Sequence, residues 1–411
     1  MSRLLLLIPS TSYRVSDFLA AAHRLGVDVT VGSDEESVLN ELSSSATLSL
    51  DFVAPDKAAL EIEKFNASFP LAAVVAVDDV TSIIAAKASK LLGLPHNDPE
   101  AVAATGNKLL FRKRLHQFDL ASPNFKSVSL DSDPDNLAQT VNFPCVLKPL
   151  NLSASRGVIR ANDEVEFCAA FERIKSLLKT IGSASHPEII IEDFIEGEEV
   201  ALEGLMVEGK LTVLALFDKP DPLDGPYFEE TLYVTPSRLL PDFQSSVKTM
   251  AEQAANAIGL NEGPIHAELR VNPKAQHSNE TGPWIIEMAA RSIGGLCSRS
   301  LEFGDGLSLE DIILRHATGA SIVPDRETTA SGVMMIPIPK AGMLERVDGT
   351  LEAQAVSGIT EITISIANGQ QVIPLPEGEK YLGFIFAKAE TPEEVEAALR
   401  TAHAKLKFEI T

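Results

Sequence analysis

Cysteine is scarce in this sequence of 411 residues, which contains only Cys145, Cys168 and Cys297. These cysteines lack the paired spacing that holds a disulfide framework or a tetrahedral zinc ion, so we expect neither feature. A reducing, cytoplasmic compartment fits this cysteine usage.

Positive charge is scarce as well. The chain has 35 Lys and Arg residues against 58 Asp and Glu residues, which gives a formal net charge of −23. Nucleic acids and anionic membranes bind basic surfaces, so this balance argues against both kinds of partner. It still permits a nucleotide site, because such a site needs only a few well-placed cations.

Long hydrophobic runs do not occur either. The apolar run Leu4–Ile8 is far too short to cross a bilayer and no signal-peptide cleavage pattern follows it, so we expect no transmembrane segment. Apolar residues nevertheless make up 45% of the chain and the mean hydropathy is +0.08, which is typical of a globular protein. A chain of this length exceeds one ordinary core, and we expect two or three domains.

The first hundred residues predict an α/β domain with a parallel sheet. A leucine-rich strand, a turn, a helix that ends at Gly26 and another strand form a βαβ unit. Strands are predicted at 3–8, Val27–Val31 and 71–79, and helices at Val15–Leu25 and Ser82–Leu92. The G-x-G-x-x-G fingerprint of dinucleotide-binding folds does not follow the first strand.

Polar residues at the ends of these strands have two interpretations. Ligands of open parallel sheets bind at the carboxyl ends of the strands. The alternative is that the polar residues serve as turn and helix-cap residues. The residues concerned are Ser10, Thr11, Tyr13, Arg14 and Asp78.

The most informative stretch is Ile265–Gly295, in which two alternating runs flank a polar loop. Alternation predicts two strands, and the loop predicts that they pair antiparallel. This pairing can set Glu268 and Glu287 side by side. Facing carboxylates repel unless a cation lies between them, and Mg²⁺ prefers carboxylate and phosphate oxygens. The alternative is that both glutamates are solvated residues on an exposed sheet face.

Two lysines stand beside backbone that suits a bound anion. Lys108 falls in the first turn of a helix begun by Thr105 or Asn107, where the helix dipole disfavours a cation unless an anion is present. Lys148 ends a strand predicted at 143–148, and a small polar turn follows it. The turn offers backbone and hydroxyl donors and the lysine supplies charge, as in a phosphate cradle, although an ordinary hairpin is the alternative. The turn residues concerned are Ser153, Ser155 and Gly157.

The segment 187–202 predicts a strand, a short linker and a second strand. Glu192 and Glu199 stand on either side of the linker residues Phe194 and Ile195. This arrangement suits a flat base in a crevice beside a carboxylate that accepts from a ribose hydroxyl. An acidic surface turn is the alternative interpretation.

Two later regions have a different character. A loop rich in Pro and Gly follows residue 219, and within it Phe228, Glu229 and Glu230 are candidates for recognising an amine, with a plain loop as the alternative. From about residue 325 the sequence is β-rich, and an amphipathic helix is predicted at Thr391–Leu406.

Taken in order, these motifs resemble the ATP-grasp superfamily. The motifs are NK at 107–108, VLKP with SASRGV, IIEDFIEGEE, HAELRVN and EMAARSIGG, and together they cover roughly 105–320. EMAARSIGG, the opening SYRVSDFLAAAHRLGVDV and the C-terminal segment are similar to the L-amino-acid ligases, or dipeptide synthetases.

This resemblance implies a mixed α/β (α+β) fold in three parts. An N-terminal βαβ parallel-sheet domain spans 1–104, and an ATP-grasp core with a mobile lid at about 143–200 spans 105–322. A small β-rich domain at 323–411 covers one side of the active site. A separate regulatory or dimerising module is the alternative for this last part, and a homodimer is left open.

The resemblance also implies a reaction. ATP phosphorylates a carboxylate, an amine attacks the acyl phosphate, and an amide, most simply a dipeptide, is released with ADP and phosphate. The substrates are then small molecules, either amino acids or another carboxylate and amine. One alternative is an ATP-grasp ligase with non-amino-acid substrates, such as those of the purine-pathway ligases. Another is a non-catalytic ATP-binding protein.

Residue roles on the nucleotide side follow from the same resemblance. Lys108 and Lys148 become phosphate ligands, and the loop 153–157, with Ser153, Ser155 and Gly157, becomes a flap over the phosphates. Glu192 accepts from the adenine amino group beside Phe194 and Ile195, and Glu199 holds the ribose.

On the metal and substrate side, Glu268 and Glu287 would hold two Mg²⁺ ions, with Mn²⁺ as an alternative. Arg291 would steady the carboxylate and the developing oxyanion. The substrate pocket would be lined by His266, Gly294 and Gly295, with Cys297 as a further candidate. Many ATP-grasp enzymes have E-x-N where this chain has Ala289, so we expect water or substrate to complete the shell of the second metal.

Overall fold

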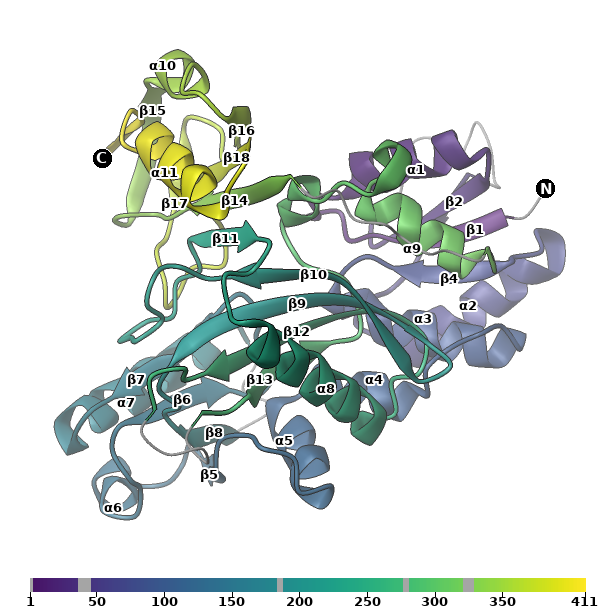
Figure 1. Ribbon diagram of the computed structural model, residues 1–411. Coiled ribbons are helices and arrows are strands. Elements are labelled where there is room, and N and C mark those ends of the chain that lie inside the picture. Colours follow the sequence, from purple (N-terminus) through teal and green to yellow (C-terminus); the bar gives the residue numbers. More distant parts are fainter. Residues whose placement is uncertain (1–2, 36–45, 183–187, 276–280, 321–328) are drawn as a thin grey trace.

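The N-terminal domain is built on a parallel sheet. The structure, a computed structural model, describes residues 3–35, 46–182, 188–275, 281–320 and 329–411 (Figure 1). The sheet has the strand order β3-β2-β1-β4, with bounds Thr47–Ser49, Asp28–Ser33, Arg3–Leu7 and Ala73–Ala76. Leu4 and Leu6 of β1 pack in one core with Phe18, while Leu5 and Leu7 pack in another with Ile84. Both faces of β1 are therefore buried, which explains its continuous run of leucines.

The helices of this domain begin and end where capping residues occur. Helix α1 (Val15–Leu25) ends at Gly26 with φ of 62°, as predicted. Helix α3 (Asp79–Leu92) begins before the predicted Ser82, because Asp78 and Thr81 form a capping box. Helix α2 (Pro55–Ser68) packs beside α3.

The core of the molecule is a long antiparallel sheet with the order β13-β12-β9-β10-β11-β14-β18-β16. Its bounds are Trp284–Ala289, Gly263–Val271, Glu198–Val207, Lys210–Asp218, Leu232–Thr235, Ala330–Ile336, Gly383–Ala389 and Ile359–Ile364. Strands β9 and β10 form an antiparallel hairpin. Helices pack on this sheet and beside one another: α4 (Pro99–Thr105), α5 (Lys108–Gln117) and α8 (Pro241–Ile258).

A smaller sheet forms a lid at the lower left of Figure 1. Its order is β5-β8-β6-β7, with bounds Phe125–Ser129, Glu188–Asp193, Cys145–Pro149 and Ile159–Ala161. Helix α7 (Glu164–Thr180) packs on β6 and β7, and α6 (Pro134–Ala138) packs on α7. The lid sheet starts before the expected residue 143, and β9 already belongs to the long sheet.

The C-terminal region continues the long sheet. Strand β14 pairs with β11, so that Leu232 lies opposite Met334. A small sheet, β17-β15-β19 (Gln370–Val372, Gly342–Asp348, Lys407–Ile410), and the helices α10 (Thr350–Gln354) and α11 (Pro392–His403) complete it. The predicted boundary at 322 lies outside the described residues. The mixed α/β class, with its parallel N-terminal sheet and β-rich C-terminal region, is confirmed.

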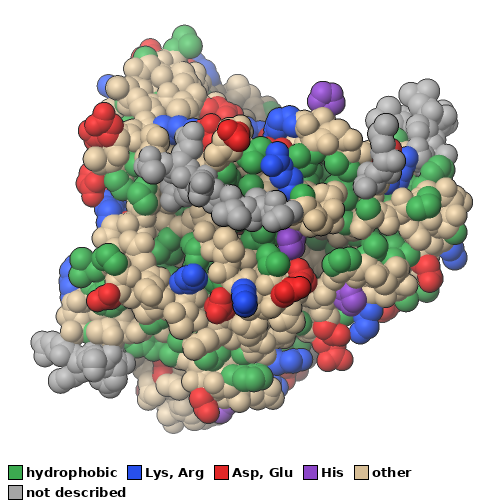
Figure 2. All heavy atoms as spheres, turned by 45° about the vertical axis from the view of Figure 1, so that its right-hand side comes forward, with side chains coloured by type: hydrophobic (Ala, Val, Ile, Leu, Met, Phe, Trp, Pro, Cys, Tyr) green, Lys and Arg blue, Asp and Glu red, His purple; other side chains and the backbone are tan. Residues whose placement is uncertain are grey.

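Two ion pairs, one buried and one partly exposed, fix the N-terminal domain to the core through α9 (Leu309–Ala317). Arg14, which is 1% exposed, pairs with Glu310 at 3.0 Å, and Arg24 pairs with Asp311 at 2.6 Å. Figure 1 accordingly shows α9 beside α1. On the face in Figure 2, Lys and Arg side chains lie among Asp and Glu side chains, in a band across its middle. Within the described ranges, no helix combines the length and apolar character needed to cross a membrane.

Candidate active site

A cleft lies between the lid and the long sheet, and about 630 Å³ in and around it, open solvent included, is free of protein atoms. The structure brings many of the predicted residues together in the wall of this cleft: Lys108, Lys148, Ser155, Glu192, Phe194, Ile195, Glu199, Glu268 and Glu287. Phe228 and Glu230 of the later loop also line it.

Glu268 on β12 and Glu287 on β13 are direct cross-strand neighbours, as the alternation predicted. Their side chains are 18% and 41% exposed, respectively. Glu268 Oε1 lies 3.2 Å from Nζ of Lys219, and Glu287 Oε1 lies 3.6 Å from Nζ of Lys108. Two facing carboxylates at the wall of a cleft are chemically suited to a hard divalent cation.

Lys108 is the first residue of α5, and Asn107 caps that helix by accepting from the Leu110 N–H. The ammonium of Lys108 donates to the carbonyl of Leu152, just before the flap, at 2.7 Å. We use the name flap for residues 153–157. Lys108 therefore links the start of α5 to the flap and to Glu287.

Lys148 and Glu192 lie on the neighbouring strands β6 and β8 of the lid, and their ion pair measures 2.6 Å. Arg112 of α5 completes a buried triad, with its Nε 2.7 Å from the other oxygen of Glu192. Burial alone raises the pKa of Glu192, but Arg112 and Lys148 more than offset this and lower it to about 2. Arg112 was missed from the sequence, although its position four residues after Lys108 places both on one face of α5.

The predicted linker between β8 and β9 carries an aromatic wall. The rings of Phe194 and Phe228 have centroids 6.4 Å apart. The guanidinium of Arg270 lies 5.0 Å from the Phe194 centroid and donates to the Ile195 carbonyl at 2.6 Å. A flat base has apolar surface to contact here, and the adenine role stays a prediction.

Lys219 occupies the centre of a carboxylate cluster. Its Nζ lies 2.8 Å from Glu199, 2.5 Å from Glu230 and 3.2 Å from Glu268. Carboxylate oxygens of these three glutamates lie within 4.8 Å of one another. Burial lowers the pKa of Lys219, but the three glutamates raise it well above its ordinary value.

Lys219 and Arg270, which pairs with Glu199 at 2.9 Å, were both missed. A signal for Lys219 exists in the sequence. It precedes a proline at the end of an apolar strand, as Lys148 does.

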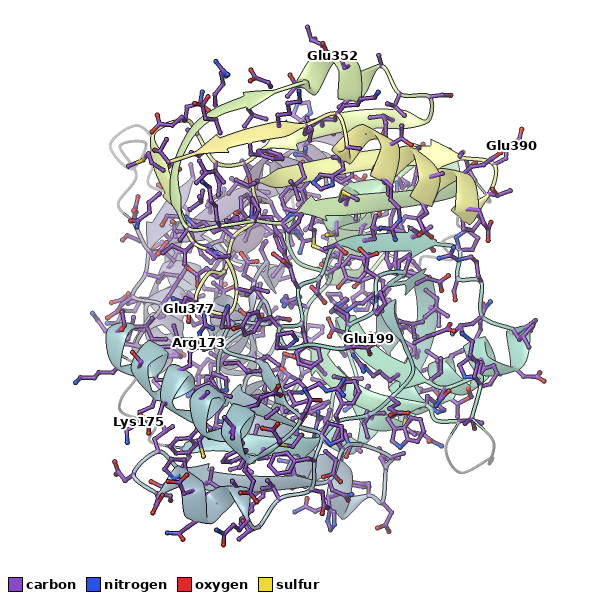
Figure 3. All side chains as sticks on the ribbon, turned by 90° about the vertical axis from the view of Figure 1, so that its left-hand side faces the viewer. Arg173, Lys175, Glu199, Glu352, Glu377 and Glu390 are labelled. Atoms are coloured by element: carbon purple, nitrogen blue, oxygen red, sulfur yellow. The ribbon has the colours of Figure 1, made fainter. Side chains whose placement is uncertain are left out.

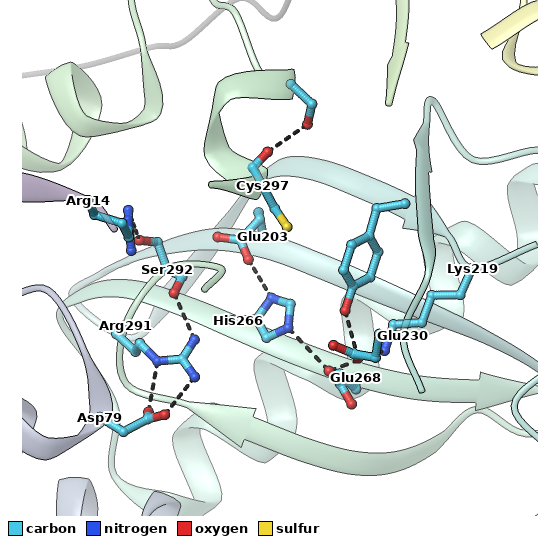
Figure 4. Close-up of polar contacts among 12 residues, drawn as sticks. Arg14, Asp79, Glu203, Lys219, Glu230, His266, Glu268, Arg291, Ser292 and Cys297 are labelled. Atoms are coloured by element: carbon cyan, nitrogen blue, oxygen red, sulfur yellow. Dashed lines mark hydrogen bonds and ion pairs between the residues drawn. The ribbon is translucent and has the colours of Figure 1, made fainter. Parts of the chain in front are cut away.

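His266 is held between two carboxylates on the face of the long sheet (Figure 4). Its Nδ1 lies 2.5 Å from Glu203 and its Nε2 lies 3.4 Å from Glu268. Burial lowers the pKa of His266, but Glu203 and Glu268 more than offset this and raise it to about 9. The two carboxylates thus favour the protonated form of the ring. Glu203, which is 0% exposed, was not predicted, although it shares the alternating face of β9 with Glu199.

Arg291 follows β13 and reaches to the N-terminal domain. Its Nε and Nη2 donate to the two oxygens of Asp79 at 2.8 and 2.7 Å. A Cβ on Gly294 would meet nothing within 4 Å, whereas Gly295, with φ of 59°, lies against Phe384. The backbone at Gly294 therefore leaves room for close approach.

The flap is tied to the C-terminal region. Gly157 N–H donates to the carbonyl of Pro376 at 2.8 Å, and Arg156 donates to the carbonyl of Glu377 at 2.8 Å and to Glu379 at 2.7 Å. Arg173 of α7 forms a fork with both oxygens of Glu377 at 2.6 and 2.9 Å, and Figure 3 shows these two side chains together. The C-terminal region thus contacts the lid beside the phosphate flap.

The N-terminal candidates lie apart from the cleft wall. Arg14 is buried against Glu310, and Asp78 caps α3, so these two follow the turn-and-cap interpretation. Ser10 N–H donates to Asp34 at 2.7 Å. Cys297 is 1% exposed, and burial raises the pKa of its thiol.

Comparisons with known proteins match all three parts of the chain. Residues 19–96 match the ATP-grasp N-terminal domain, residues 141–300 the ATP-grasp domain, and residues 334–411 the L-amino acid ligase C-terminal domain 2. The protein y4rH of Sinorhizobium fredii is 21% identical over 416 residues, which cover 100% of this chain and 84% of that protein.

Two further relatives carry functional names. Alanine–anticapsin ligase of Bacillus subtilis is 26% identical over 270 residues, which cover 62% of this chain and 55% of that ligase, so the match spans about half of its length. The crystal structure of an L-amino acid ligase from Bacillus licheniformis has a TM-score of 0.79 at 24% identity and covers 100% of this chain and 99% of that one. With the lid, the cleft and the strand pair already described, these matches show that the chain carries an ATP-grasp domain over residues 141–300, with the fold of an L-amino acid ligase, and that its C-terminal part resembles that of the L-amino acid ligases.

Proposed function

We propose that this protein is an ATP-dependent carboxylate–amine ligase that joins two amino acids through an acyl-phosphate intermediate. The observation that carries the proposal is the meeting of lysines and carboxylates in one cleft. Lys108 and Lys148 line it, Glu268 lies opposite Glu287, and the buried Lys219 pairs with Glu268. Phosphoryl transfer asks a protein mainly for positioning and charge neutralisation, which this set of side chains can supply.

The proposed reaction has two steps. In the first, a carboxylate oxygen of the acyl substrate bonds to the γ-phosphorus of ATP, and the bond to the bridging oxygen breaks, so that ADP leaves. In the second, the neutral amine bonds to the acyl carbon, the bond from that carbon to the phosphate oxygen breaks, and the nitrogen gives up one proton. The products are an amide, ADP and phosphate.

The nucleotide would lie between the lid and the long sheet. Lys108 and Lys148 would contact its phosphates under the flap, and Phe194 and Ile195 would contact the base. Glu192 is already engaged by Lys148 and Arg112, so an adenine amino group would be a further partner of its carboxylate. Glu199 would hold the ribose beside Arg270. Closure of the flap would exclude water, which otherwise hydrolyses an acyl phosphate.

The acyl substrate would lie at the Arg291 end of the cleft. Arg291 is assigned to its carboxylate and to the oxyanion that develops there. His266, held by Glu203, is assigned to the pocket wall together with Gly294 and Gly295.

Glu268 and Glu287 are the residues that would hold Mg²⁺, with Mn²⁺ as an alternative. The bound metal would neutralise phosphate charge during transfer. Ala289 offers no side-chain oxygen, so the ligands of a second metal would have to come from water or substrate.

The test is phosphate release with ATP and Mg²⁺ across single and paired amino acids, with products identified by mass. We expect release that depends on amino acids and a condensed dipeptide. Glu287→Gln should lose this release, and Glu352→Gln, the same change on the exposed helix α10 far from the cleft in Figure 3, should keep it. If the wild-type protein binds ATP but releases no phosphate with any amino acid of the panel, the assignment of amino acids as substrates is wrong.

A further inference from the structure

Asp79 begins α3 just after the carboxyl end of β4, and its carboxylate reaches the loop that follows β13 (Figure 4). The two partners in this ion pair, Asp79 and Arg291, are 212 positions apart in the chain. The contact therefore exists only because the N-terminal domain is docked on the core.

The contact fixes the plane of the guanidinium. Asp79 Oδ1 accepts from Nε of Arg291 at 2.8 Å and Oδ2 accepts from Nη2 at 2.7 Å. Such a fork has geometric specificity as well as energy, because two parallel bonds define an orientation. A third bond, from Nη1 to the carbonyl of Ser292 at 2.9 Å, holds the guanidinium against its own loop.

The N-terminal domain holds this loop at a second point. The hydroxyl of Ser292 accepts from Nη2 of Arg14 at 2.9 Å, and Arg14 is itself anchored to Glu310 at 3.0 Å. Residues of the N-terminal domain thus hold both the side chain of Arg291 and the next residue, Ser292.

Arg291 retains donors for a ligand. A guanidinium has about five N–H donors, and the three bonds above engage one on each nitrogen. One N–H on each terminal nitrogen has no partner within the part of the chain that the structure describes. A carboxylate accepts two such N–H groups at once. The pair is also accessible, since the side chains of Arg291 and Asp79 are 15% and 38% exposed.

We propose that Asp79 is a positioning residue of the acyl-substrate site. It clamps the Nε edge of Arg291 and so presents the remaining donors to the substrate carboxylate. The N-terminal domain then contributes to the substrate site by orienting Arg291. This inference rests on the proposed function, because Arg291 must bind the acyl group for its orientation to matter.

The test is steady-state phosphate release by Asp79→Asn, with the amino acid that supports the fastest release by the wild-type enzyme. Asparagine keeps the shape and removes the charge and one acceptor. We expect kcat/KM for that acid to fall by about 10–100-fold, mainly through a higher KM, because a misplaced positioning group costs up to about 10²-fold. The KM for ATP should stay within about two-fold, since ATP lies at the other end of the cleft.

Two variants and one measurement separate this role from a structural one. Asp79→Glu keeps the charge and should recover part of the lost activity. Asp56→Asn removes an equivalent carboxylate from the first turn of α2, where it pairs with Lys87, and should leave both KM values unchanged. ADP affinity, measured by calorimetry, should be the same in every variant that is folded.

Other outcomes would overturn the inference. A lower KM for the acid in Asp79→Asn would mean that Asp79 competes with substrate for Arg291. Asp79 would be only a structural contact if the KM for the acid were unchanged. The same conclusion would follow if the KM values for the acid and for ATP rose equally and ADP bound more weakly. If the wild-type enzyme releases phosphate and Asp79→Asn has the same kinetic constants, only this inference is refuted. If the wild-type enzyme releases no phosphate with any substrate, the proposed function and this inference are refuted together.

Discussion

The proposed nucleotide and acyl ends of the site are held in different ways. In the cleft, where we propose that the nucleotide binds, Lys148 meets Glu192 on the adjacent strand of the lid, and Lys219 meets Glu199 from 20 positions away. Arg291, which we assign to the acyl substrate and which is not among the described residues that line the cleft, meets Asp79 across 212 positions and across a domain boundary. The first end is built by strands of the lid and the core sheet, and the second by the docking of the N-terminal domain.

This difference suggests that the two ends can be damaged separately. A change at the nucleotide end should weaken phosphate chemistry for every acyl substrate. A change at the acyl end should leave the nucleotide in place and affect only what is joined to it.

The largest effect is expected for Glu287→Ala. This change removes one of the two facing carboxylates beside the phosphates, so we expect turnover to fall by at least about 10³-fold through loss of metal binding. Calorimetry of Mg²⁺–ADP binding, together with ADP release, measures both parts of the effect. Near-normal ADP release from this variant would contradict the metal role of Glu287.

Arg291→Ala should produce a loss of about 10²–10³-fold in amide formation while ATP affinity is kept, because Arg291 is assigned to the acyl group alone. ATP affinity is measured by titration, and amide formation is measured on the same sample from the mass of the product. A collapse of ATP affinity would show that the two ends are not independent and would refute the assignment.

The contrast between the two ends also explains which residues could be predicted from the sequence. Lys108, Lys148, Glu268 and Glu287 line one cleft, and the sequence linked them through short motifs that resemble those of the ATP-grasp superfamily, while their roles stay predictions. The pairing of Glu268 with Glu287 was anticipated from the alternation of the two strands together with the loop that joins them.

The residues that were missed depend on tertiary contacts. Asp79 is one of two adjacent aspartates after a strand, and only domain docking shows which of them meets Arg291. Arg112 and Glu203 are buried charges whose partners lie on other elements of the fold, so the local sequence does not identify those partners. The lid begins earlier in the chain than expected because β5 pairs with β8, although a long segment that includes α7 separates the two strands in the sequence.

Glu192→Gln should reduce stability more than it reduces catalysis. It leaves Arg112 and Lys148 buried without their counter-charge, and breaking such a pair costs about 3–5 kcal/mol. The pKa of Glu192 is depressed to about 2, so its contribution is fully present above the unfolded pKa of about 4.3 and is lost as pH falls toward 2.

The unfolding temperatures of the wild-type protein and of Glu192→Gln, compared at pH 7 and pH 3, test this sign. The gap between the unfolding temperatures of the two proteins should be wide at pH 7 and narrower at pH 3, because Glu192 of the unfolded wild-type chain takes up a proton below its unfolded pKa of about 4.3 while the folded carboxyl is still ionised. A gap that is constant with pH would mean that Glu192 is stabilised by something other than its two cations.

The smallest effect is expected where the lid meets the C-terminal region. Arg173→Ala removes the fork to Glu377, whose backbone carbonyl also accepts a hydrogen bond from Arg156 of the flap. Both partners are partly exposed, and such pairs contribute about 0.2–1 kcal/mol, so we expect the KM for ATP to rise only about two- to five-fold. The rise should shrink at high salt, because exposed charges are screened. Lys175→Ala, on the same helix but away from Glu377 in Figure 3, should change nothing. Equal effects of the two variants would mean that the charge of α7, and not its contact with the C-terminal region, influences the flap.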